Sequence, residues 1–60
     1  MVNTVMKQFN PKDFIVTQDG KRGYVVRQLD VNTYLIHLAS GLTVRTGDQL
    51  EIDVIMQEND

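Results

Sequence analysis

Cysteine and tryptophan are absent from this 60-residue chain, which has one histidine, His37, and one proline, Pro11. Without cysteine the chain forms neither a disulfide nor a thiolate zinc site. With one histidine, a metal cage built from side chains would consist mostly of carboxylates. Domains of this size usually gain stability from disulfides, a metal or a partner subunit. Self-association is the source of stability that this composition leaves, and the lack of cysteine is compatible with a reducing cytoplasm.

Long hydrophobic runs are missing as well. No apolar stretch approaches the roughly 20 residues that span a bilayer. The N-terminus is interrupted by Lys7 and lacks the basic-then-apolar order of a signal peptide. We therefore expect a single-domain, soluble, cytoplasmic protein without membrane association.

Catalytic and cofactor-binding motifs are also lacking. The glycines form neither a G-x-G-x-x-G nor a Walker pattern. His37 has no possible cysteine partner and alternates with apolar neighbours, which favours a structural role. Asp48, Glu51 and Asp53 match no calcium loop and are expected on a solvated face. We expect no enzyme activity, catalytic residue, cofactor, metal or small-molecule substrate, so binding is the default function.

What the chain does contain is a regular succession of short β-type segments between Asp13 and Val54. The expected strands cover residues 13–18, 21–29, 33–39, 42–46 and 50–56. Turn signals separate them at residues 19–20, 30–32, 40–41 and 47–48. Asp19 and Gly20 both tolerate the positive φ of a two-residue type I′ hairpin, and Gly23 suggests a bulge or bend. This rhythm predicts an all-β fold, a small five-stranded antiparallel barrel over residues 12–56.

The two ends of the chain differ from this pattern. Val2, Val5, Met6 and Phe9 have the spacing of a short amphipathic helix, although the Val and Thr content also suits an added strand. Pro11 would end such a helix. We expect residues 1–11 to form an arm or short helix on the barrel, and residues 57–60 to be a polar tail.

Several strands are apolar on both faces, which is typical of strands covered on both sides. Ile15, Leu35 and Ile55 fall on the face expected to point outward. The N-terminal segment, a second copy of the chain or another protein could cover them. We favour the N-terminal arm together with a homodimer.

Charge is divided unevenly along the chain. Residues 1–47 carry six basic and three acidic side chains, a net +3, whereas residues 48–60 carry five acidic side chains and no basic one. Such asymmetry sometimes marks a basic binding face with a competing acidic tail. Charges that maintain solubility and protect strand edges are the favoured interpretation.

The segment from Asp13 to Asp53 resembles the SH3-like barrels of the KOW type. The resemblance rests on a first strand, the basic glycine turn of residues 19–23, the β-branched strand of residues 24–29, and the short strands that follow. KOW modules serve transcription and ribosome proteins, and the resemblance implies Lys21, Arg22 and Arg27 as contacts to RNA or protein. Residues 42–52 are also similar to the closing half of AbrB-type DNA-binding domains, but the preceding residues depart from that pattern.

Two binding functions follow. The favoured one is a protein–protein adaptor or inhibitor anchored by Ile15, Leu35 and Ile55, with acidic residues 48–60 steering the encounter. The alternative is an RNA- or DNA-binding module in transcription or translation. Its contact residues would be Lys21, Arg22, Tyr24, Arg27 and Arg45, with Tyr24 stacking on a base.

Overall fold

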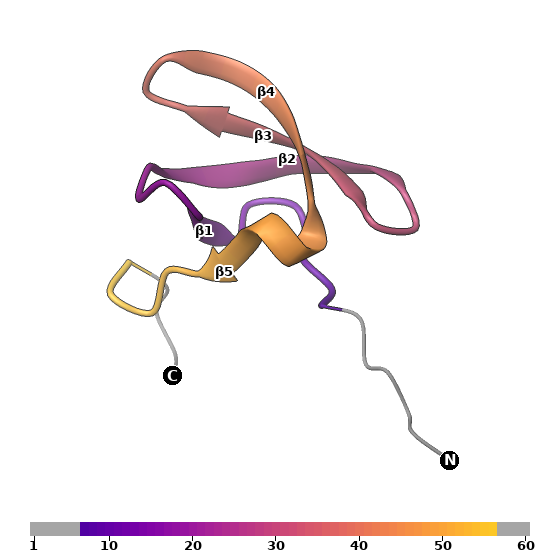
Figure 1. Cartoon of the computed structure of the whole chain (residues 1–60), viewed down its shortest axis with the longest axis horizontal. Coiled ribbons are helices and arrows are strands. Elements are labelled where there is room, and N and C mark those ends of the chain that lie inside the picture. The colour runs from indigo at the N-terminus through magenta and orange to yellow at the C-terminus, as the bar shows by residue number, and fades with distance from the viewer. Residues whose placement is uncertain (1–6, 57–60) are drawn as a thin grey trace.

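The computed structural model describes residues 7–56, which form five antiparallel strands and one short 3-10 helix (Figure 1). The strands are β1 (Phe14–Thr17), β2 (Arg22–Asp30), β3 (Thr33–Leu38), β4 (Gly41–Thr46) and β5 (Leu50–Ile52). The 3-10 helix η1 (Gly47–Gln49) lies between β4 and β5. The predicted all-β class is confirmed.

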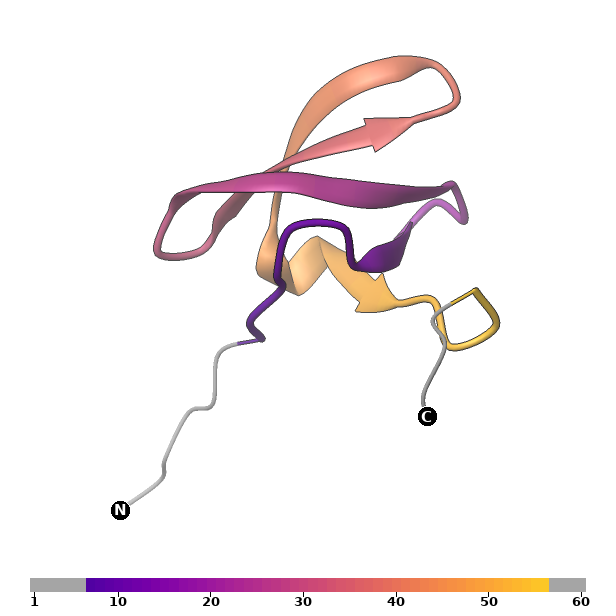
Figure 2. The same cartoon turned by 180° about the vertical axis from the view of Figure 1, so that it is seen from behind.

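All five strands belong to one sheet in the order β4-β3-β2-β1-β5. The first four strands form a meander, and β5 returns to pair with β1. In Figures 1 and 2, β4 curves from the β3–β4 turn down to η1, which brings the chain back beside β1. Within residues 7–56 the two edge strands, β4 and β5, do not pair with each other, so the sheet is not closed by strand pairing.

The β1–β2 turn differs from the expected two-residue type I′ hairpin. Gly20 has φ +85°, but Asp19 has no positive φ. The Gly20 N–H donates to Thr17 O at 2.9 Å, and the Thr17 N–H donates to Lys21 O at 2.8 Å. Three residues therefore separate the paired positions, a loop length that places one left-handed residue, usually glycine, at its end.

The bulge expected at Gly23 lies elsewhere on β2. Register shifts occur between Val25 and Arg27 and between Gln28 and Asp30. Gly23 instead permits close strand contact, because a Cβ built on it would lie 2.1 Å from the carbonyl oxygen of His37. The glycine serves packing between β2 and β3 rather than an irregular backbone.

The hydrophobic core lies on one face of the sheet. Its members are Phe9, Ile15, Val25, Tyr34, Ile36, Leu38 and Leu50. Ile15 has no exposed surface, so its expected outward position is wrong. Both faces of β1 are apolar, and it is the Ile15 and Thr17 face that turns inward, while Phe14 stays 37% exposed.

Part of the N-terminal segment covers one side of this core. Phe9 is 4% exposed, and its ring meets the ring of Tyr34 edge-on with centroids 5.3 Å apart. The Tyr34 hydroxyl accepts a hydrogen bond from the Phe9 N–H at 3.3 Å. Residues 7–10 form no helix or strand, and the helix-or-strand alternative for residues 1–6 lies outside the described residues.

The last strand is shorter than the alternation of residues 50–56 predicts. β5 ends at Ile52, and Val54 to Met56 form a turn. Asp53 causes the change, because its Oδ1 accepts hydrogen bonds from the N–H groups of Ile55 (3.2 Å) and Met56 (3.3 Å). Aspartate favours such local turns over a continued strand. The expected polar tail at 57–60 lies outside the described residues.

Candidate binding surface

The register of β1 to β4 places four residues in a line on the face opposite the core. Phe14 pairs with Tyr24, Tyr24 with His37, and His37 with Leu42. Side chains of directly paired residues project from the same face of a sheet. We call this line, Phe14–Tyr24–His37–Leu42, the outer-face row.

The outer-face row is apolar and substantially exposed. Tyr24 is 40% exposed and Leu42 is 63% exposed. The rings of Tyr24 and His37 stack with centroids 5.2 Å apart and planes 21° from parallel. His37 is thus an exposed member of an aromatic surface rather than a core histidine.

A second line of paired residues runs beside the outer-face row. Leu35 pairs with Arg27 on one side and with Val44 on the other. Leu35 is half-buried and Val44 is 49% exposed. The apolar surface therefore extends over two adjacent lines of the sheet, with Arg27 at its border.

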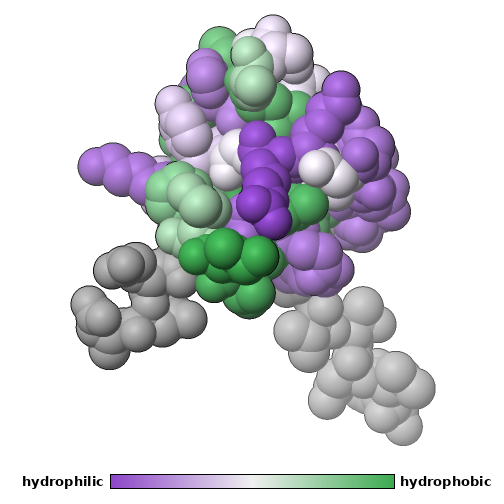
Figure 3. All heavy atoms as spheres, turned by 90° about the vertical axis from the view of Figure 1, so that its left-hand side faces the viewer, coloured by the Kyte–Doolittle hydropathy of each residue, from purple (hydrophilic) through white to green (hydrophobic). Residues whose placement is uncertain are grey.

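The three residues expected to anchor a protein partner do not lie together. Ile15 belongs to the core, Leu35 to the outer face, and Ile55 to the turn after β5. Ile55 is 73% exposed beside Val54 at 74%, which forms a separate apolar cap. Figure 3 shows hydrophobic atoms gathered low on one face of the molecule.

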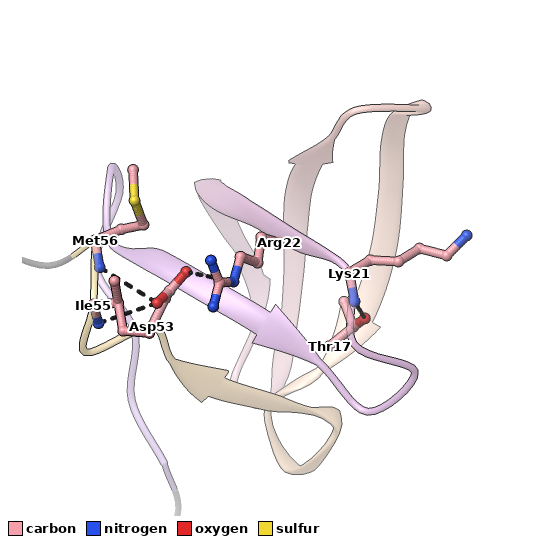
Figure 4. A network of polar contacts seen from close by, with 6 residues as sticks. All are labelled: Thr17, Lys21, Arg22, Asp53, Ile55 and Met56. Atoms are coloured by element: carbon pink, nitrogen blue, oxygen red, sulfur yellow. Dashed lines mark hydrogen bonds and ion pairs between the residues drawn. The ribbon is translucent and has the colours of Figure 1, made fainter.

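The basic residues proposed for nucleic acid are likewise divided. Arg22 and Tyr24 share the outer face of β2, and Arg27 follows on the same strand beyond the bulge. Arg45 pairs with the buried Tyr34 and so belongs to the opposite face. Its Nη1 donates to Thr43 Oγ1 at 2.9 Å and to Val44 O at 3.2 Å. Lys21 lies in the preceding turn, where its backbone N–H donates to Thr17 Oγ1 at 3.0 Å (Figure 4).

Asp53 is the polar residue whose importance the sequence did not indicate. Its side chain is 3% exposed, and Oδ2 lies 3.4 Å from Nε of Arg22 (Figure 4). One sequence signal could have revealed the role of Asp53. An aspartate directly after a strand often accepts hydrogen bonds from the backbone N–H groups two and three residues later. Arg22, expected to contact nucleic acid, is thereby paired with Asp53, while its own side chain stays 56% exposed.

The acidic residues of the C-terminal part do not converge on one site. Glu51 pairs with Lys7, Asp53 pairs with Arg22, and Asp48 accepts a hydrogen bond from Asn32 Nδ2 at 3.4 Å. Within residues 7–56 no three side chains of histidine, aspartate or glutamate are grouped so that they could hold a metal ion.

Two exposed turn carboxylates are stabilised in their charged form. A hydrogen bond from Thr17 lowers the pKa of Asp19 below its ordinary value, with smaller contributions from its own backbone N–H and from Lys21 and Arg45. A hydrogen bond from Thr46 lowers the pKa of Asp48, aided by its backbone N–H, Asn32 and Lys7. Both carboxylates accept hydrogen bonds within turns. This structural role explains the lowered pKa values without a catalytic function.

Comparison with known proteins identifies no relative of this chain: no protein family, curated protein or solved structure matches it. None of the helical structure in residues 7–56 is long and apolar enough to cross a lipid bilayer.

Proposed function

We propose that this protein is a non-catalytic binding module that docks a protein partner on the outer face of its sheet. The observation that carries the proposal is the outer-face row, an exposed apolar line that continues across β1 to β4. Surfaces of this kind, with aromatic residues at the centre and arginine nearby, are typical of protein interfaces.

The chemistry of the row suits a protein partner better than a small ligand. Tyr24 and His37 present a flat stacked surface, while Leu42 and Val44 add aliphatic area toward the edge of the sheet. Burial of such side chains contributes about 25 cal/mol for each Å² of apolar surface removed from water. Arg27 at the border supplies a charge that orients an acidic partner.

The same interpretation includes an SH3-like barrel as the scaffold. The return of β5 beside β1, the curvature of β4 toward η1 and the register shifts in β2 support it, since bends and bulges allow a small sheet to approach closure. On such a scaffold the outer-face row stays on a rigid set of strands.

The experiment is affinity capture from a lysate of the source cell with wild-type protein and two variants. Tyr24→Asp places a charge at the centre of the row, and Val31→Asp places the same charge in the β2–β3 turn, where Val31 is 65% exposed. We expect a partner retained by wild type and Val31→Asp and lost with Tyr24→Asp. Equal capture by both folded variants, as judged by circular dichroism, would rule out the outer face as the docking site.

A nucleic-acid function is the second candidate, favoured by one observation. The Tyr24–His37 stack lies on the same face as Arg22 and close to Arg27 on β2. Exposed aromatic rings beside arginine are how sheet surfaces bind single strands. Fluorescence anisotropy with single-stranded RNA and DNA at roughly 50 mM salt tests it, because phosphate contacts are strongest at low salt. Absence of binding to both would end this alternative.

A further inference from the structure

The two edges of the sheet differ in how they are protected. β5 has three residues, and Lys7 covers it, because its Nζ donates to Leu50 O at 3.2 Å and pairs with Glu51. A lysine over a short edge strand is a common protection against pairing with another chain. This edge is therefore closed to a further strand.

The β4 edge is longer, and one basic side chain covers part of it: Arg45 Nη1 donates to Val44 O at 3.2 Å. β4 pairs with β3 over six residues without a register shift, and within residues 7–56 it pairs with no other strand. Its sequence, GLTVRT, has no proline, no lysine and no carboxylate. A regular edge strand of this kind can pair with another chain.

Two hydrogen bonds show which backbone groups of β4 point away from β3. Val44 O accepts from Arg45 Nη1 at 3.2 Å, and the Thr46 N–H donates to Gln49 Oε1 at 3.1 Å. Because outward groups alternate along an antiparallel strand, those of Leu42 point the same way. Leu42 and Val44 thus supply the outward groups for a new partner. The Thr46 N–H is already used inside the chain, and Val44 O would accept from the new partner in addition to Arg45 or in its place.

We propose that two copies of this chain pair antiparallel through β4, about a two-fold axis at Thr43. This register places Leu42 opposite Val44 of the second copy and uses the backbone groups of these two residues. It leaves the bond between Thr46 and Gln49 intact. Closed two-fold dimers are the commonest form of self-association.

The side chains of β4 complement one another in this register. Leu42 and Val44, 63% and 49% exposed in the single chain, form apolar pairs across the axis. Thr43 meets Thr43 of the second copy on the other face, a favourable cross-strand pair. Arg45 lies opposite Gly41 of the second copy, and a Cβ on Gly41 would have no neighbour within 4 Å, so the space is open. No like charges are placed directly opposite each other.

The expected dimer is reversible. A six-residue strand edge spans only roughly 20 Å, so we expect it to bury less than the roughly 800 Å² per partner of a standard stable interface. Concentration should therefore decide how much dimer forms. The contact uses Leu42 and Val44 at the border of the proposed docking surface, and it joins the outer faces of two copies into one surface.

Sedimentation equilibrium of the full chain tests the pairing over roughly 10 μM to 1 mM, a range that covers weak association. Leu42→Lys removes both apolar pairs, and Val31→Lys adds the same charge away from the edge. We expect wild type and Val31→Lys to form dimers, and Leu42→Lys to raise the dissociation constant about tenfold or more. A wild type that stays monomeric throughout, or a Leu42→Lys variant that associates like Val31→Lys, would overturn the proposal.

The register and the surface have their own tests. Thr43→Lys and Thr43→Glu place like charges at the axis, so each alone should associate weakly and the mixture should associate more tightly than either. A mixture that associates no more tightly than its components would contradict the axis at Thr43.

Tyr24→Asp tests which surface pairs, and this variant should dimerise as wild type does. If Tyr24→Asp abolished association while Leu42→Lys did not, the copies would be stacking through their outer faces, and edge pairing would be wrong.

Discussion

The carboxylate of Asp53 holds three groups at the end of β5. Oδ1 accepts from the N–H groups of Ile55 and Met56, Oδ2 lies 3.4 Å from Arg22, and the Asp53 N–H donates to Phe14 O at 2.9 Å. Among the described residues Oδ2 has no hydrogen-bond partner beyond this ion pair. At the residue scale, one buried acid therefore ends a strand, shapes the following turn and orients a basic side chain.

Replacing Asp53 by alanine should cost about 1–3 kcal/mol of unfolding free energy, because the Ile55 N–H loses its acceptor, the Met56 N–H loses one of two acceptors, and Arg22 loses its ion pair. Asp53→Asn keeps an oxygen acceptor and loses the charge, so it should be less damaging. Urea unfolding followed by circular dichroism measures both. Glu51→Ala is the matched control, since it breaks an exposed ion pair worth at most about 1 kcal/mol. Equal losses for Asp53→Ala and Glu51→Ala would show that the Asp53 contacts contribute little.

Individual positions also show where sequence reasoning reached its limit. Alternation separated the two faces of β1, β3 and β4 correctly, and Leu35 lies on the outer face as expected. It could not choose the inner face of β1, because Phe14 and Ile15 are both large and apolar. The choice depends on β5, whose Leu50 pairs with Thr17 on the Ile15 side. That pairing joins residues more than 30 positions apart, beyond any local pattern.

At the scale of elements, β2 and β3 approach each other closely at Gly23. Because Gly23 has no side chain, the carbonyl of His37 can approach it closely. A Cβ built on Gly23 would lie 2.1 Å from the His37 carbonyl oxygen and 2.7 Å from the Leu38 side chain. His37 is a member of the outer-face row, so its position depends on this approach. A backbone atom cannot move aside as a flexible side chain can.

Gly23→Ala should therefore destabilise the protein by about 3 kcal/mol or more, at the upper end of overpacking costs. Gly20→Ala is the control. Gly20 has φ +85° and open space around its Cβ position, so its cost should be the left-handed penalty of about 1–2 kcal/mol. Thermal unfolding of both variants measures the difference. If Gly23→Ala were the milder change, β2 and β3 would not be held at this separation.

The elements themselves were largely predictable, since the turns fall close to the expected positions and five strands are present. Two of the errors share one physical cause, which is side-chain hydrogen bonding. Asp53 shortens the last strand, and Thr17 with Asp19 shapes a three-residue turn where Asp-Gly alone suggested two. These contacts reach only two or three residues along the chain, but alternation and residue propensity do not specify which side-chain oxygen forms a hydrogen bond.

At the scale of the whole molecule, the divided charge of the sequence is brought together by folding. Lys7 of the basic part pairs with Glu51, and Arg22 pairs with Asp53 of the acidic part. Neither pair leaves a broad field of one sign, which favours a protein partner over nucleic acid. Lys7 also covers part of the β5 edge, and β4 is the edge proposed to pair with another chain.

A dimer formed through β4 should make thermal stability depend on concentration, because association stabilises only the folded chain. Raising the protein concentration about a hundredfold should raise the Tm of wild type by a few degrees, since small domains respond by roughly 4–8 °C per kcal/mol. Leu42→Lys should show a Tm that does not change with concentration, whereas Val31→Lys should follow wild type. Differential scanning calorimetry at several concentrations measures this. If the Tm of wild type did not change with concentration, association would not stabilise the folded chain. The 60 residues would then be stable without a partner strand on β4.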